Sequence, residues 1–149
     1  SWDNIHLLNL TVFRKFKNDW EVGAKWRFIG GSPYTPWDVE RSANKLAWDI
    51  QGRGYLDYER YNSERLAPFH QLDIRIDKAF YFDRWTLMVY ADVQNVYNFK
   101  ADQPPILVRE TDSNNMPLTD PDNPENYQMK FIEGSAGTVL PSIGVIIEF

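Results

Sequence analysis

The feature of this sequence that most limits its possible folds is a strict alternation of apolar and polar residues over long segments. In residues 20–28, Trp, Val, Ala, Trp and Phe occupy successive even positions, while Glu, Gly, Lys and Arg occupy the odd positions between them. Neighbouring side chains of a β-strand point to opposite faces, so a period of two predicts a strand with one apolar and one polar face.

Five segments alternate in this way, and we expect five strands. Their approximate ranges are 5–14, 19–31, 69–81, 85–98 and 140–149. They are longer than the strands of about 5–6 residues that are usual in globular proteins. They suit the roughly 9–11 residues with which a tilted strand crosses a bilayer. The predicted fold is all-β, an antiparallel segment of a transmembrane β-barrel.

The connections between these strands alternate in length. Tight turns are expected at residues 16–18 and 82–83, whereas loops occupy residues 32–68 and 99–139. Antiparallel strands joined in this way carry all their short turns at one end and all their long loops at the other. That arrangement is typical of outer-membrane barrels, which have short periplasmic turns and long external loops.

Turn length predicts the register of both hairpins. The predicted pairs are Arg14 with Trp20, Val12 with Val22 and Leu8 with Trp26 in the first hairpin, and Phe80 with Trp85, Ile76 with Val89 and Ile74 with Ala91 in the second. Each pair belongs to one predicted face, which a slip of one residue would not preserve. The same register sets Asp73 opposite Asp92, which is unfavourable unless Arg75 or water intervenes.

Aromatic residues fall at both ends of the predicted apolar face. Near the tight turns lie Trp20, Phe80, Trp85 and Phe149, and near the long loops lie Trp26, Phe28 and Tyr97. Aromatic rings settle at the headgroup level of a bilayer. The pattern therefore predicts two interface belts that bracket an aliphatic band.

The opposite face carries polar side chains, which we interpret as a lumen wall. Its members are Lys25, Arg27, Gln71, Asp73, Arg75, Asp77, Tyr90, Asp92 and Gln94. Paired carboxylates also serve acid–base catalysis, but polar interior residues are expected in a large barrel. We therefore assign no catalytic residue and expect the protein not to be an enzyme.

Composition excludes several other functions for this chain of 149 residues. A net charge of −5 with scattered basic residues argues against a nucleic-acid partner. Cysteine is absent, and His6 and His70, the two histidines, lie far apart and outside any ligand motif, so no metal or cofactor is expected. The longest apolar run, residues 87–91, is far shorter than the roughly 20 residues of a membrane-spanning helix.

The last strand ends on an aromatic residue and carries a recognisable spacing. Ser142, Gly144, Ile147 and Phe149 resemble the C-terminal sorting signal of Gram-negative outer-membrane barrels. In that family the barrel-assembly machinery reads the final strand. The resemblance implies that this machinery is a partner during biogenesis.

Two internal stretches extend the resemblance. Residues 69–78, Phe-His-Gln-Leu-Asp-Ile-Arg-Ile-Asp-Lys, and residues 87–98, which contain Asp-Val-Gln-Asn-Val-Tyr-Asn, look like the closing strands of TonB-dependent outer-membrane receptors. Residues 30–36, Gly-Gly-Ser-Pro-Tyr-Thr-Pro, look like the top of a barrel strand in that family. These receptors are barrels of about 22 strands with an N-terminal plug, and they import siderophores, cobalamin, oligosaccharides or peptides.

The resemblance implies that residues 1–149 are the C-terminal part of such a barrel, in the outer membrane. The plug and the TonB-contacting segment have no counterpart in this sequence. The expected partners are the lipid bilayer, the remaining strands and plug of the same receptor, and the TonB energy-transducing complex through the absent N-terminal part.

Two other classes of protein remain open at this point. One is a non-transporting outer-membrane barrel, either an adhesin or an enzyme such as a phospholipase. The other is a soluble β-sandwich that binds carbohydrate through its aromatic residues. A sandwich predicts that the apolar strand faces lie in a dry protein core rather than against lipid.

The long loops are predicted to contain some structure of their own. Residues 106–109 and 127–132 are expected to form a hairpin. Loop aromatics are candidates for stacking on a ligand, but packing of the loop on itself is the favoured interpretation because a long ordered loop needs a small core. The four candidates are Trp37, Trp48, Tyr55 and Tyr58.

Overall fold

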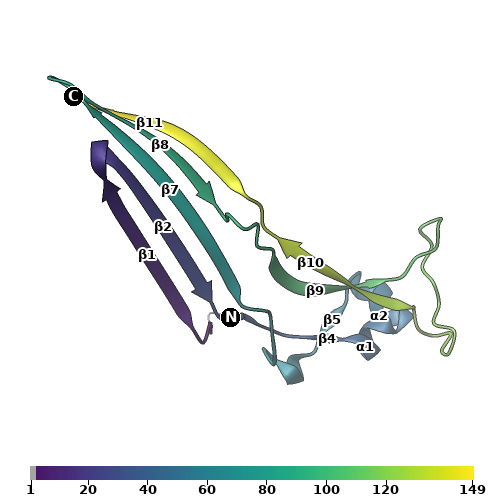
Figure 1. Cartoon of the computed structure of the whole chain (residues 1–149). Helices are drawn as coiled ribbons and strands as arrows, with labels where there is room; N and C mark the ends of the chain where they lie inside the picture. Colours follow the sequence, from purple (N-terminus) through teal and green to yellow (C-terminus); the bar gives the residue numbers. More distant parts are fainter. Residues whose placement is uncertain (1–2) are drawn as a thin grey trace. The chain divides into compact units, whose positions relative to one another are not determined.

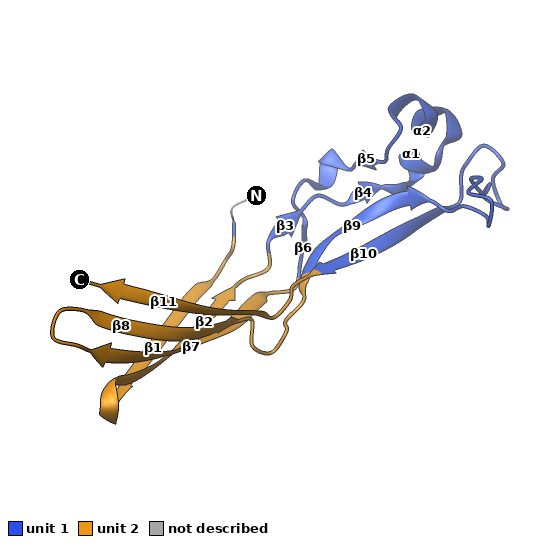
Figure 2. Ribbon diagram, turned by 90° about the horizontal axis from the view of Figure 1, so that it is seen from above, with its two compact units in different colours: residues 1–3, 32–66, 102–135 blue, residues 4–31, 67–101, 136–149 orange. Residues whose placement is uncertain are grey.

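The computed structural model describes residues 3–149. It is 56% β-strand in antiparallel sheets, which places the chain in the all-β class. Two units make up the chain (Figure 2). Unit 2 comprises residues 4–31, 67–101 and 136–149, and unit 1 comprises residues 32–66 and 102–135 together with Asp3.

Unit 2 is a five-stranded antiparallel sheet (Figure 1). The order across the sheet is β1, β2, β7, β8, β11. The strands are β1 (Leu7–Phe16), β2 (Trp20–Ile29), β7 (Phe69–Tyr81), β8 (Thr86–Gln94) and β11 (Leu140–Glu148). Each of these strands overlaps one of the segments that alternate in the sequence, with ends that differ by up to a few residues; β1 extends two residues beyond the predicted end at 14.

The register of the first hairpin differs from the prediction by two residues. Leu8 pairs with Phe28 instead of Trp26, because the turn is the 3-10 segment η1 (Lys17–Asp19) rather than residues 16–18. Asn18 and Asp19 in this turn have φ values of 61° and 58°. Asn and Asp tolerate this left-handed conformation better than other residues with a Cβ atom, which fixes the turn at these positions.

The second hairpin is displaced by two residues as well. Phe80 pairs with Leu87 instead of Trp85, and Ile76 pairs with Ala91 instead of Val89. The turn includes Trp85, whose ring stacks on that of Phe82 with centroids 4.2 Å apart, and the Phe82 amide donates to the Trp85 carbonyl oxygen at 2.9 Å. A slip of two residues preserves the faces, so the alternation alone does not detect it.

The corrected register removes the unfavourable pairing of two acids. Arg75, rather than Asp73, lies opposite Asp92. Asp73 lies opposite Lys25 on its other side. Opposite charges on directly facing residues stabilise a sheet, whereas like charges destabilise it. The observed register is therefore the one that the charges favour.

Strand β8 ends at Gln94, four residues before the predicted end at 98, because Asn95 turns the chain. Asn95 has a φ of 53° and is buried. Its side-chain oxygen accepts from the Phe99 amide at 2.8 Å, and its side-chain nitrogen donates to the carbonyl oxygens of Phe99 and Thr138 at 3.0 and 3.2 Å. The backbone N–H of Asn95 donates to the Asp73 carboxylate at 3.0 Å. The side chain of Asn95 therefore ties the end of β8 to the segment that leads into β11, and its backbone ties the same point to β7.

The sheet of unit 2 is a single layer. Every residue of β1 is exposed, and so is every residue of β11 except Gly144. Among the described residues, Ala79 is the only buried apolar residue of this unit. The large apolar side chains of the sheet are therefore not covered by a core.

Unit 1 is built from the two long loops. Its hairpin of β9 and β10 agrees with the prediction for residues 106–109 and 127–132. The sequence predicts no helix in residues 32–68, whereas the structure has two short α-helices there. No helix in residues 3–149 is long and apolar enough to cross a membrane. The elements are β3 (Pro33–Tyr34), β4 (Trp37–Asp38), α1 (Val39–Ala43), α2 (Lys45–Gln51), β5 (Tyr55–Leu56), η2 (Tyr58–Arg60), β6 (Glu64–Arg65), β9 (Ala101–Arg109) and β10 (Met129–Ala136).

Backbone hydrogen bonds join the two loops of unit 1. The Lys45 amide donates to the Glu125 carbonyl oxygen at 3.0 Å, and the Tyr127 amide donates to that of Ala43 at 2.8 Å. Ala43, Trp48 and Leu107 supply the buried apolar residues of this unit. The two loops thus share one small core, although they are far apart in the sequence.

Candidate functional site: the two faces of the sheet

One face of the sheet is mainly apolar along all five strands. The register places the even-numbered residues of β1, β2 and β7 on the same face as the odd-numbered residues of β8 and β11. Large side chains on this face are open to the surroundings, with exposed fractions of 67% for Val12, 82% for Ile143 and 58% for Val145. An uncovered apolar face of this extent indicates a contact with another apolar phase or surface.

Aromatic side chains occupy both ends of the apolar face. Trp20, Phe80 and Trp85 lie at the end of the tight turns, and Phe149 follows β11 with its side chain fully exposed. At the other end, the rings of Trp26 and Phe28 have centroids 6.0 Å apart. The His70 Nδ1 and the Tyr97 hydroxyl at this end are 2.7 Å apart.

The other face carries a chain of ionic and polar contacts. Arg27 is 3.3 Å from Asp73, and Gln71 donates to the same carboxylate at 2.6 Å. The Arg75 guanidinium donates to Asp77 at 2.7 Å along the strand. All nine residues predicted for a polar wall lie on this face, since they are odd-numbered in β2 and β7 and even-numbered in β8.

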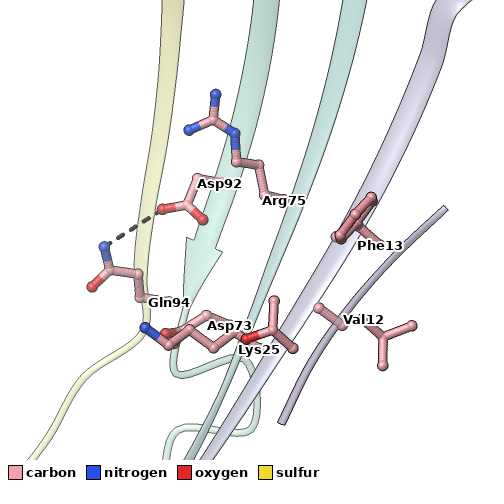
Figure 3. A pocket seen from close by; sticks show the side chains of 10 residues that line it. Val12, Phe13, Lys25, Asp73, Arg75, Asp92 and Gln94 are labelled. Carbon is pink, nitrogen blue, oxygen red and sulfur yellow. Dashed lines mark hydrogen bonds between the residues drawn. The ribbon is translucent and has the colours of Figure 1, made fainter. Parts of the chain in front are cut away.

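A pocket opens on the polar face beside Lys25, Asp73 and Arg75 (Figure 3). A Cβ atom at Gly23 would be in ordinary van der Waals contact with the Phe13 Cβ and the Val12 carbonyl oxygen, both 3.9 Å away. Phe13 borders the pocket on β1, and Lys25 and Arg75 border it on β2 and β7. Phe13, with 67% of its surface exposed, is one of several apolar side chains on this face, together with Leu7, Ile29, Met88 and Ile146.

The contacts of the carboxylates are those of a surface network. Asp73 accepts from Arg27, Gln71 and the Asn95 amide, and Asp77 accepts from Arg75. Asp92 accepts from Gln94 at 3.5 Å. Residues 3–149 bring together no group of three or more His, Asp or Glu side chains suited to a metal ion.

Tyr90 and Gly144 make a contact that sequence reasoning missed. They face each other across β8 and β11 on the polar face, and a Cβ atom at Gly144 would overlap the tyrosine ring. The Arg75 guanidinium covers the ring with a separation of 4.1 Å from its centroid. The glycine of the predicted assembly signal therefore has a packing role in the folded sheet, because it leaves room for the ring.

Replacing Gly144 by alanine is expected to lower the free energy of unfolding by about 1–3 kcal/mol, since the added methyl group displaces the Tyr90 ring. In a Tyr90→Ala background the same replacement is expected to be nearly neutral. A double-mutant cycle from denaturant unfolding measures this coupling. Equal costs in the two backgrounds would show that the ring does not rest on Gly144.

The four loop aromatics have different environments in unit 1. Trp48 is buried, Trp37 donates from its indole nitrogen to the Pro105 carbonyl oxygen at 2.6 Å, and the Tyr55 hydroxyl donates to that of Ala47 at 3.0 Å. Tyr58 is 71% exposed. Three of the four candidates thus take part in the packing of the unit, and Tyr58 alone offers an open ring.

Ionic contacts also hold unit 1 together. Asp49 is 3.7 Å from Arg109 and accepts from the Tyr127 hydroxyl at 3.0 Å. The hydrogen bond from the Arg60 guanidinium holds the pKa of the Asp57 carboxyl below its usual range. These contacts join residues of the two loops, or close a turn within one of them.

The fold and the two faces define an all-β protein with a two-sided, single-layer antiparallel sheet. Comparisons with protein-family models, with curated proteins and with solved structures find no match to this chain.

Proposed function

We propose that unit 2 is part of the wall of an outer-membrane β-barrel, and that the chain is the C-terminal part of a TonB-dependent receptor that takes up a nutrient. The observation that carries the first part is the single-layer sheet, mainly apolar on one face and rich in charged and polar residues on the other. Such a sheet is suited to stand between lipid and an aqueous lumen.

The exposed apolar face favours lipid over water. Burial of apolar surface is worth about 25 cal/mol per Å², and this face has no covering layer in unit 2. The aromatic residues at its two ends, Trp20 and Phe80 at one and Trp26 and Phe28 at the other, suit the headgroup levels of a bilayer. The strands β7 and β8, with 13 and 9 residues, are of the length that crosses one.

The edges of the sheet extend the proposal to further strands. β1 and β11 are the outer strands, and each has a neighbour on one side only. In lipid every backbone donor and acceptor needs a partner, so both edges pair with additional strands of the same barrel. The polar face then lines the lumen, where the charged rows around Asp73 and Arg75 meet a plug.

The receptor class rests on sequence resemblance, carried by residues 69–78 and 87–98 and by the final strand. It implies location in the outer membrane, insertion by the barrel-assembly machinery and energy from the TonB complex. We expect the full-length protein to bind the periplasmic domain of TonB. Absence of that binding would contradict the assignment to TonB-dependent receptors, but it would not contradict the proposed barrel wall.

The barrel wall is tested with single cysteines; residues 1–149 contain none of their own, and any cysteine elsewhere in the full-length protein is first replaced by serine. Spin labels are attached one at a time at positions 72–77 of β7 in the full-length protein, inserted into phospholipid vesicles. Even positions are expected to collide with lipid-soluble oxygen, and odd positions with a water-soluble nickel chelate. The period of two follows from the two faces of the strand.

A soluble β-sandwich gives a different result. Labels at even positions would then be shielded from both oxygen and nickel by a second sheet, and the protein would remain outside the vesicles. Either finding would contradict the proposed wall.

A further inference from the structure

The apolar face carries an unbalanced positive charge. In the five strands, Arg14 and Lys78 are the only Lys or Arg residues on this face, and it contains no Asp or Glu. The polar face, in contrast, supplies an acid for most of its cations: Glu21 lies 3.6 Å from Lys15, and Asp73 and Asp77 pair with arginines.

Both cations lie near the tight turns, among aromatic rings. The Lys78 ammonium donates to the Asn18 carbonyl oxygen and lies 5.8 Å from the centroid of Trp20 and 5.1 Å from that of Phe80. The Arg14 guanidinium lies 5.2 Å from the centroid of the Phe16 ring. Phe16, Trp20 and Lys78 form one row across β1, β2 and β7, and Arg14 is two residues from Phe16 on β1.

This placement suits the boundary between acyl chains and headgroups. A cation at the centre of a bilayer is costly, but Lys and Arg side chains near the end of a spanning element reach the interface. Aromatic rings settle at the same level. A phosphate of an anionic lipid would provide there the negative charge that this face of the protein lacks.

We propose that Arg14 and Lys78 bind the phosphate of an anionic phospholipid, with Trp20 and Phe16 packed against its glycerol and upper acyl chains. This inference rests on the proposed barrel wall, because it needs the apolar face to be in lipid. The lipid belongs to the leaflet at the tight-turn end of the sheet.

The test measures which lipids surround the inserted protein. The full-length protein is inserted into phosphatidylcholine vesicles, and spin-labelled phosphatidylglycerol and phosphatidylcholine compete for its surface. A preference for phosphatidylglycerol is expected. Arg14→Gln and Lys78→Gln should each lower this preference by up to about five-fold. The factor corresponds to the roughly 1 kcal/mol that one basic residue contributes near an anionic surface.

Charge-conserving variants separate binding from misfolding. Arg14→Lys and Lys78→Arg are expected to keep the preference. Lys15→Gln, which removes a cation from the polar face, is expected to leave it unchanged. Equal association of the two lipids, or an equal loss in Lys15→Gln, would overturn the lipid site while the protein remains inserted. Failure to insert into any vesicle would overturn the barrel wall and the lipid site together.

Discussion

Replacing Ile74 by arginine is expected to lower the free energy of unfolding in a bilayer by about 2–4 kcal/mol. Ile74 is near the middle of β7, and its neighbours across the sheet are Ala24 and Val93. An arginine there would enter the most apolar part of the proposed lipid contact. Val89 is a poorer site for this test because it lies opposite Lys78, so an arginine would also add repulsion between like charges.

Gln94→Arg is the matched control for Ile74→Arg. Gln94 lies on the polar face and is exposed, so the same side chain introduced there would meet water and Asp92. Its expected effect is within about 0.5 kcal/mol. Unfolding of the full-length protein in lipid vesicles, followed against denaturant, measures both variants. Equal costs would mean that the two faces of the sheet meet the same medium.

Trp48→Ala is expected to lower the stability of unit 1 by about 3–5 kcal/mol, because it removes the largest buried side chain of a small core. Trp48 is only 7% exposed, and the Arg109 guanidinium lies 5.5 Å from the centroid of its ring. The loss is expected to separate the two loops that form the unit. The sheet of unit 2 keeps its own hydrogen bonds, so the opening should be local.

Native-state hydrogen exchange measures this opening at the amides of Lys45 and Tyr127, which join the two loops. Exchange at both amides should become at least about a hundred-fold faster, because each loss of about 1.4 kcal/mol in the stability of the unit raises the exchange rate about ten-fold. Ile50→Ala is the control, since Ile50 belongs to the same helix and is 77% exposed. Unchanged exchange in Trp48→Ala would show that the ring does not hold the loops together.

The strands were predictable because alternation is a local property with a strong physical cause. A side chain on one face of a strand meets a different medium from its neighbour, so the sequence carries the faces directly. Residues 20–28 and 69–81 show this most clearly, and both lie in strands of the structure.

The register was not predictable from alternation, since a slip of two residues keeps every side chain on its face. Two other signals in the sequence favour the observed pairing. Asn18 and Asp19 suit a left-handed turn, and pairing Arg75 with Asp92 avoids two facing acids. The contact of Tyr90 with Gly144 depends on the register of β11 against β8. A long loop joins these two strands, so no turn length was available from which to predict that register.

Most of the structure of unit 1 was not predictable from periodic patterns in the sequence. Helices α1 and α2 have only 5 and 7 residues, too short for a helical period to emerge. Their capping residues were the available signal: Asp38 accepts from the Arg41 amide, Asn44 accepts from the Ala47 amide, and Gly52 ends α2 with a φ of 71°. The packing of one loop on the other joins irregular segments, for which no periodic pattern exists.

The odd number of strands in the sheet of unit 2 has a geometric consequence. Because neighbours alternate in direction from β1 to β11, the two outermost strands run the same way. Copies of this sheet following one another around a ring would therefore meet edge to edge in parallel. A cylinder held together only by antiparallel pairs needs an odd number of strands from elsewhere, the first and last of them running against β1 and β11.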